Sequence, residues 1–173
     1  MDFAFLPFDD AKLDATEAAW RSDNIGESVF PGDINYALNV ARKQSYNGEL
    51  VGTGIGYGVF PVGAADAVAI VEVFVSQHGK RWLKMMSCTL RPSLQEAVYV
   101  NDKLAIDKAL DAYGTALSGV LDLHEEHHAT AVRIYGRHDV FLNFLKELAR
   151  AVHEKGIGEA TVDVQGRWLV VHP

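Results

Sequence analysis

The sequence has very little cysteine and no long apolar run. Cys88 is the only cysteine among 173 residues, so no disulfide can form within the chain, and we expect a cytoplasmic setting. The longest apolar run, Ala67–Val71, is interrupted by Glu72 and is far shorter than a membrane-spanning helix. The opening residues Met1–Phe5 lack the basic segment of a signal peptide. We therefore expect no membrane partner.

Basic clusters are also missing. The longest run of basic residues is Lys80-Arg81, and the formal net charge is −7. Proteins that bind the nucleic-acid backbone need a basic footprint, so direct DNA or RNA binding is not expected. The acidic charges are scattered, which favours a role in solubility over a dedicated surface for a basic partner. The length predicts a single domain over residues 1–173, and a homodimer is the commonest assembly for such a chain.

Three dipeptides mark predicted β-hairpins, because glycine and asparagine tolerate the positive φ angles of tight turns. They are Asn47-Gly48 between Tyr36–Ser45 and Glu49–Phe60, His78-Gly79 between Val68–Val75 and Arg81–Arg91, and Gln165-Gly166 between Glu159–Val164 and Arg167–His172. The first two hairpins would join through the turn Pro61–Asp66 into an antiparallel meander.

Two helices are predicted from helical spacing of apolar residues. The first begins near Asn101 or Asp102, either of which can cap a helix, and the second begins near Asp139. The predicted buried faces are Ile106, Leu110, Tyr113, Leu117, Val120 and His124 in the first helix, and Phe141, Phe144, Leu145, Leu148 and Val152 in the second.

The remaining segments are shorter. Thr130–Tyr135 and Phe3–Phe8 are predicted strands, Ala11–Trp20 is a predicted short helix, and residues 21–35 are predicted to be loop. A strand–helix–strand unit together with an antiparallel meander predicts a fold of the α/β class, mixed α+β. Its central, mostly antiparallel mixed sheet would be flanked by helices.

This order of elements resembles the GNAT superfamily of acyl-CoA N-acyltransferases, whose core runs as a β meander, a long helix, a strand, a second helix and a closing hairpin. The stretches that carry the resemblance are Asn47–Gly52, which is similar to the hairpin "dGelvG" of that family, Leu90–Ser93 at the end of the central strand, and Tyr135–His138 with the helix and hairpin that follow. The likeness covers residues 36–172 and is closest to degenerate, phage-type members.

The resemblance implies acetyl-CoA as the cofactor if the chain is an enzyme, with Arg91, Ser93 and Gln95 as its contacts. GNAT enzymes hold the CoA pyrophosphate on a glycine-rich loop and the helix after it. Residues 93–101 contain no glycine, and Glu96 would repel a phosphate. The tyrosine that many of these enzymes use as an acid is also missing from residues 139–155.

Glu72 is the candidate catalytic residue. It lies within Val68–Val75, a nearly continuous apolar run that predicts burial on both faces of a sheet. Burial raises the pKa of a carboxylate, which suits a general base, and the GNAT resemblance implies that role for a glutamate on a central strand. The alternative is a structural glutamate at a sheet edge, or one paired with Lys84 or Arg91.

Two further motifs are candidates for a metal site or a ligand contact. His124-Glu125-x-x-His128 matches a zinc-peptidase pattern that needs both histidines on one helix face. The segment falls at a predicted helix end, so we expect no metal site. The glycines of Gly52–Gly58 alternate with larger residues, which predicts close packing of a helix or an aromatic ring over one face of a strand; close approach of a ligand is the alternative.

Two functions therefore compete, with a zinc peptidase third. The first is a GNAT-like domain that has lost its acyl-CoA site and acts by binding a protein partner, as an inhibitor or assembly factor. The second is an N-acetyltransferase that acts on a small or protein amine with acetyl-CoA. The missing glycines and tyrosine favour the first.

Overall fold

The computed structural model describes residues 2–23, 31–43, 54–76, 81–155 and 161–172. The predicted turns at Asn47-Gly48 and His78-Gly79 lie outside these residues, as does the whole hairpin motif Asn47–Gly52. The elements, in order, are β1 (Phe3–Pro7), α1 (Asp10–Ser22), α2 (Pro31–Arg42), β2 (Ile55–Pro61), β3 (Ala69–Val75), β4 (Trp82–Leu90), α3 (Pro92–Tyr99), α4 (Lys103–Glu126), β5 (Ala131–Tyr135), α5 (Asp139–Lys155), β6 (Thr161–Gln165) and β7 (Trp168–His172).

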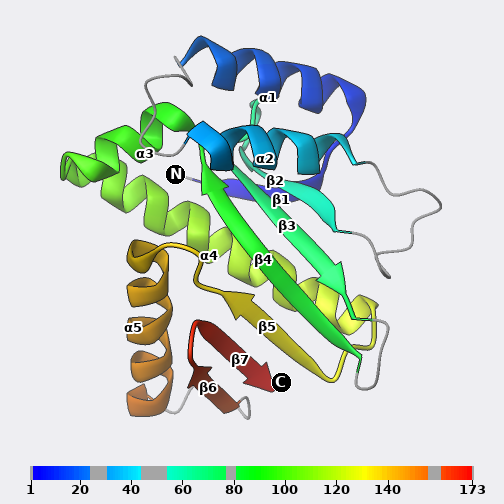
Figure 1. Ribbon diagram of the computed structural model, residues 1–173, viewed down its shortest axis with the longest axis vertical. Coiled ribbons are helices and arrows are strands. Elements are labelled where there is room, and N and C mark those ends of the chain that lie inside the picture. Colours follow the sequence, from blue (N-terminus) through cyan, green and yellow to red (C-terminus); the bar gives the residue numbers. More distant parts are fainter. Residues whose placement is uncertain (1, 24–30, 44–53, 77–80, 156–160, 173) are drawn as a thin grey trace.

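All seven strands form one sheet, in the order β1-β2-β3-β4-β5-β7-β6. Each neighbouring pair is antiparallel except β4 and β5, which are parallel. The predicted fold class, a mostly antiparallel mixed sheet with flanking helices, is therefore confirmed (Figure 1). The pairs β3–β4 and β6–β7 also confirm two of the predicted hairpin pairings, and Gly166 has the positive φ of 62° that its turn requires.

The prediction for residues 31–42 is wrong. Residues 31–42 form helix α2, where we expected a loop followed by a strand. β1 takes the place of the missing strand as the partner of β2. The physical reason is visible in the sequence, because Ile34, Ala37, Leu38 and Ala41 have helical spacing and are buried along one face.

Two further details of the helices differ from expectation. Pro92–Tyr99 forms the short helix α3, which we did not predict. In α4 the buried face is built largely from Ala105, Ala109, Ala112 and Ala116, and Leu110 is 43% exposed. Small residues let this long helix lie close to the sheet. No helix within the described ranges is long and apolar enough to cross a membrane.

Helices cover both faces of the sheet (Figure 1). On one face, Trp20 of α1 and Leu38 of α2 pack with Ile70 of β3. On the other face, residues of α4 and α5 pack with Val71 and Val73 of the same strand. This double coverage confirms the burial predicted for the apolar run of β3 and explains it.

The alternating glycines serve packing, as predicted. A side chain at Gly56 would collide with the backbone of Ala41 in α2, at 2.6 Å, so this glycine lets the helix lie directly on β2. A side chain at Gly58 would meet the ring of Phe60 at 2.3 Å. One at Gly54 would meet the carboxylate of Glu72 at 2.6 Å.

Strands β4 and β5 diverge in the middle of the sheet. Their pairing runs from Trp82 opposite Ala131 only to Met85 opposite Ile134. The register between β3 and β4 shifts at the same place, which leaves Met86 as an extra residue in β4. Beyond this bulge the two strands separate, as Figure 1 shows, and β4 continues alone to Leu90 on its β5 side.

Candidate functional site

A cavity of about 450 Å³ fills the space where β4 and β5 separate. We call it the β4–β5 opening. It is lined from β4, from α3 and α4, from the segment between β5 and α5, from the start of α5, and by Arg167 between β6 and β7. Its lining includes Ser87, Cys88, Thr89, Gln95, Tyr113 and Phe141. Its volume lies within the range of small-molecule and cofactor pockets, about 300–1,000 Å³.

The opening contains one buried polar atom that has no partner among the described residues. Gln95 Oε1 is buried and accepts no hydrogen bond. Ser87 and Thr89, which also line the opening, are only 3% and 8% exposed. Buried polar groups are normally hydrogen-bonded, so an unsatisfied buried acceptor in a cavity indicates a binding site.

Glu72 lies on β3, opposite Ser87 of β4. It is 7% exposed, and both of its carboxylate oxygens accept from the hydroxyl of Tyr36 in α2, at 2.8 and 2.9 Å. Glu72 is therefore neither at a sheet edge nor paired with Lys84 or Arg91. Burial and the hydrogen bond to Glu72 together raise the pKa of Tyr36 above its usual value. Sequence reasoning missed Tyr36 because it placed this residue on a strand.

The rim of the opening is held by ion pairs to α2. Arg137 Nη2 lies 3.0 Å from one carboxylate oxygen of Asp33, and His138 Nε2 lies 2.8 Å from the other. The Arg137 guanidinium also lies over the ring of Tyr36, 5.2 Å from its centroid. On the far side, Arg167 pairs with Asp139 at 3.0 Å. The charged groups of the rim are therefore matched within the chain.

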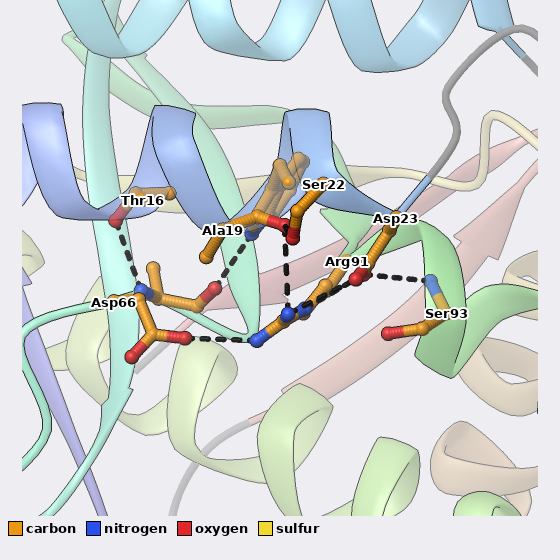
Figure 2. A network of polar contacts seen from close by, with 9 residues as sticks. Thr16, Ala19, Ser22, Asp23, Asp66, Arg91 and Ser93 are labelled. Atoms are coloured by element: carbon orange, nitrogen blue, oxygen red, sulfur yellow. Dashed lines mark hydrogen bonds and ion pairs between the residues drawn. The ribbon is translucent and has the colours of Figure 1, made fainter.

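A second polar site lies at the start of α3, and we call it the α1–α3 corner (Figure 2). Arg91 donates to both carboxylate oxygens of Asp23, at 2.7 and 3.0 Å, and to Asp66 at 2.8 Å. The backbone N–H of Ser93, in the first turn of α3, donates to the same Asp23 carboxylate at 3.1 Å. The Asp23 carboxylate thus accepts hydrogen bonds from both the Arg91 guanidinium and the N-terminus of α3.

The electrostatics of Asp23 favour its ionised form. Burial alone would raise its pKa, but the hydrogen bonds from Arg91 and Ser93 outweigh burial and lower the pKa below its ordinary value. A pyrophosphate does not fit this arrangement, because the donors that would bind it, Arg91 and the N–H of Ser93, already bind the negative side chain of Asp23. The next helix, α4, is capped in the same way by its own Asp102, which accepts from Ala105 N–H at 3.0 Å.

The residues predicted as cofactor contacts are thus divided between two places. Arg91 and Ser93 meet at the Asp23 carboxylate of the α1–α3 corner. Gln95, one turn further along α3, faces the β4–β5 opening. Glu72 lies on the face of the sheet covered by α2, under Tyr36.

The zinc-peptidase pattern lacks its helical geometry. α4 ends at Glu126, and His128 has a φ of 49°, so His124 and His128 do not lie on one helix. Within the described residues, no group of three or more histidine, cysteine, aspartate or glutamate side chains could hold a metal ion.

The observed order of elements, from the meander through the long helix to the closing hairpin, is the order that the resemblance to the GNAT core predicts. A chain of a solved structure, described as the crystal structure of the NatC complex bound to Gag peptide and CoA, is similar over 100% of this chain and 99% of its own. The identity is 10% and the TM-score 0.43. A likeness at this level does not indicate what this chain binds. No protein-family model and no curated protein matches the chain.

Proposed function

We propose that this GNAT-like domain has lost its acyl-CoA site and acts by binding a protein partner. The observation that carries the proposal is the Asp23 carboxylate at the N-terminus of α3, paired with Arg91. In this fold, the start of the helix after the central strand is the place where a phosphate would be held. Here an acidic side chain of the chain itself takes the same donors.

The magnitudes support this interpretation. Two like charges about 4 Å apart repel by roughly 4 kcal/mol near a protein surface, so a pyrophosphate beside Asp23 would be strongly disfavoured. Moving Asp23 away would break a bidentate ion pair in which the Asp23 side chain is only 11% exposed. Breaking a buried pair costs several kcal/mol. Both routes weaken phosphate binding.

Exposed apolar side chains beside the opening support a protein partner. Tyr99, Val100 and Leu104 lie within six residues at the junction of α3 and α4, and they are 70%, 72% and 82% exposed. Tyr99 also lines the β4–β5 opening. Large exposed apolar residues that gather beside a cavity are typical of interaction surfaces.

The first test is a thermal-shift titration with acetyl-CoA. A ligand at about 100 times its Kd adds roughly 2.7 kcal/mol to stability, which raises the melting temperature by several degrees at this size. We expect no shift at millimolar acetyl-CoA. A saturable rise would overturn the loss of the cofactor site.

The partner half of the proposal is tested by affinity capture. The wild-type chain should capture partner proteins from a lysate of the cells that naturally produce this chain. The double variant Tyr99→Ser/Leu104→Ser should no longer capture them. Val62, 70% exposed in the turn after β2, supplies the matched control Val62→Ser. Equal loss in the control and in the double variant would contradict a specific surface at this junction.

An acyl-CoA-dependent N-acetyltransferase remains the second candidate, and Glu72 is the observation that favours it. This buried carboxylate lies directly opposite Ser87, which lines the opening. If the chain transfers acetyl groups, CoA release from acetyl-CoA in the presence of amines should be measurable and should fall at least about tenfold in Glu72→Gln. No release above background would remove this candidate.

A further inference from the structure

We infer that the open sheet face around Trp82 binds an acidic segment of a protein partner, whose carboxylate pairs with Lys84 and Arg133. We call Phe74, Trp82, Lys84 and Arg133 the Trp82 platform. It lies where β4 and β5 are paired, at the other end of these strands from the β4–β5 opening. The inference deepens the proposed function, on which it rests, because it names the chemistry of the partner and the face that holds it.

The platform lies on the face of the sheet that α1 and α2 cover only in part. Along β3, Ile70 packs with α1 and α2, whereas Val71 packs with α4 and α5. Side chains alternate between the two faces of a strand, so Phe74 shares the face of Ile70. Phe74 is directly opposite Lys84 of β4, which is opposite Arg133 of β5. Among the described elements, no helix lies in front of this half of β4 and β5 (Figure 1).

The platform contains two cations without a counterion. Lys84 and Arg133 are directly opposite each other, and within the described ranges neither has an ion-pair partner. Arg133 Nε is also buried without a hydrogen-bond partner. Like charges directly opposite each other destabilise a sheet, and a buried donor without an acceptor adds to that cost. By contrast, Arg42, Arg137 and Arg167 all pair with acidic side chains of the chain. An anion from another molecule would complete the platform.

The aromatic rings of the platform favour a carboxylate that has an apolar neighbour. The Arg133 guanidinium lies over the Trp82 ring, 3.7 Å from its centroid. Lys84 Nζ lies 5.8 Å from the centroids of both Trp82 and Phe74. Stacking holds the guanidinium plane in place, so its terminal nitrogens can bind the two oxygens of a carboxylate. The rings provide apolar area for a side chain beside that carboxylate.

The small number of cations favours a protein segment over a nucleic acid. A phosphate backbone carries a charge at every nucleotide and is bound through many cations. The platform offers two, and a strand that continued across the sheet from Arg133 over Val170 would meet Asp163 of β6. A free small anion would have few contacts on an open face. A protein segment brings its carboxylate and its apolar neighbours together.

Tryptophan fluorescence can report on the platform. The chain has three tryptophans, of which Trp20 is fully buried. Trp168 of β7 is half-buried and contacts Tyr135, with ring centroids 4.9 Å apart. The variant Trp168→Phe therefore leaves Trp82 as the tryptophan that a quencher such as acrylamide can reach. A segment bound over Trp82 should protect its fluorescence from acrylamide.

The experiment selects binders on the full chain from a phage-displayed library of random linear dodecapeptides. Selected peptides are synthesised, and their affinity is measured at about 50 and about 300 mM salt. Lys84→Gln/Arg133→Gln removes both cations of the platform. Lys103→Gln/Lys146→Gln is the matched control, because it changes the net charge equally at two exposed lysines of α4 and α5. A labelled single-stranded RNA of mixed sequence is titrated in parallel.

We expect selected peptides that are enriched in aspartate or glutamate beside an aromatic residue and that protect Trp82 from acrylamide. Their affinity should fall at least about tenfold in Lys84→Gln/Arg133→Gln, the usual range for lost hydrogen bonds to charged groups. The fall should be less than about threefold in the control variant, and affinity should be lower at the higher salt concentration. The melting temperature of Lys84→Gln should be unchanged or higher, because a like-charge pair is removed.

Three results would overturn the inference. They are a selection without acidic binders, an equal loss of affinity in the control variant, and RNA binding that the platform variant abolishes. If Lys84→Gln/Arg133→Gln does not fold, Lys84→Gln decides, and it should weaken binding at least about threefold. A lower melting temperature with unchanged affinity in Lys84→Gln would make the platform structural and would also overturn the inference.

The proposed function fails by different measurements. The loss of the cofactor site is tested by the acetyl-CoA titration, and the surface at the junction of α3 and α4 by the capture with Tyr99→Ser/Leu104→Ser. Neither measurement involves the platform. A saturable shift with acetyl-CoA would overturn the loss of the cofactor site whether or not acidic peptides bind, so the two failures are distinguishable.

Discussion

The α1–α3 corner and the β4–β5 opening lie within a few residues of each other at the end of β4, yet they treat polar groups in opposite ways. In the corner, Arg91 and the N–H of Ser93 are satisfied by acidic side chains of the same chain. In the opening, the buried acceptor Gln95 Oε1 is left unsatisfied. Groups satisfied internally stabilise the fold, whereas groups left unsatisfied are available to a ligand.

The contrast separates two neighbouring sites at the end of β4. In the corner, the chain supplies its own anion to Arg91 and to the N-terminus of α3. Where the sheet separates, it retains a cavity and a free strand edge. We therefore expect substitutions in the corner to change stability and substitutions in the opening to change binding.

The largest effect should come from Arg91→Ala. It leaves two carboxylates, Asp23 and Asp66, without their cation, and loss of one partner of a largely buried pair costs about 3 kcal/mol. Urea unfolding measures this change. Arg91→Lys keeps the charge but not the bidentate geometry, so it should lie between Arg91→Ala and the wild type. A loss below about 1 kcal/mol in Arg91→Ala would contradict a structural role for the corner.

The next largest effect concerns Tyr36, whose hydroxyl donates a hydrogen bond to the buried carboxylate of Glu72. Tyr36→Phe leaves the buried carboxylate without its donor, which we expect to cost about 2 kcal/mol of unfolding free energy. Tyr99→Phe is the control, since that side chain is 70% exposed. Similar losses in both variants would argue against the Tyr36–Glu72 hydrogen bond.

Lowering the pH should remove the contribution of Asp23 to the free energy of unfolding. Its folded-state pKa lies below the ordinary value of 3.8, so its stabilisation is present above about pH 4 and is lost as the pH falls through the folded value. Near neutrality we expect Asp23→Asn to cost about 1.5 kcal/mol. That difference from the wild type should shrink as the pH falls from about 5 to about 3. A difference that is constant over this range would mean that the charge of Asp23 is not what matters.

The smallest effect is a rescue. Asp23→Ala frees Nε and Nη2 of Arg91 and the N–H of Ser93, so inorganic pyrophosphate at a few times its Kd should restore about 1 kcal/mol in this variant and nothing in the wild type. Asp66→Ala, which leaves Asp23 in place, is the matched control. Thermal shifts with and without pyrophosphate provide the measurement. Equal shifts in all three proteins would contradict an internal anion at this helix N-terminus.

Much of the fold could be predicted because its signals are local. The hairpin of β6 and β7, the start of α4 at Asp102 and the burial of β3 all follow from neighbouring residues. Helix α2 was missed because the apparent hairpin signal at Asn47-Gly48 extended a strand back to Tyr36. The helical spacing of Ile34, Ala37, Leu38 and Ala41, with Pro31 in the first turn, was the stronger signal.

The candidate site was less accessible to sequence reasoning, because its contacts join distant residues. Asp23 and Arg91 are 68 positions apart, and Tyr36 and Glu72 are 36 apart. No spacing rule connects such pairs. The family resemblance directed attention to residues after β4, and of these only Gln95 lines the opening, where its unpaired acceptor becomes visible in the structure alone.

The most direct test of the contrast is to measure the unfolding free energies of Asp23→Ala and Gln95→Leu side by side in urea. The first variant removes a satisfied group and should be less stable than the wild type by about 2 kcal/mol. The second removes an unsatisfied buried acceptor and should be neutral or more stable by up to about 1 kcal/mol. A marked loss of stability in Gln95→Leu would show that the opening is built for the fold, and the contrast between the corner and the opening would not hold.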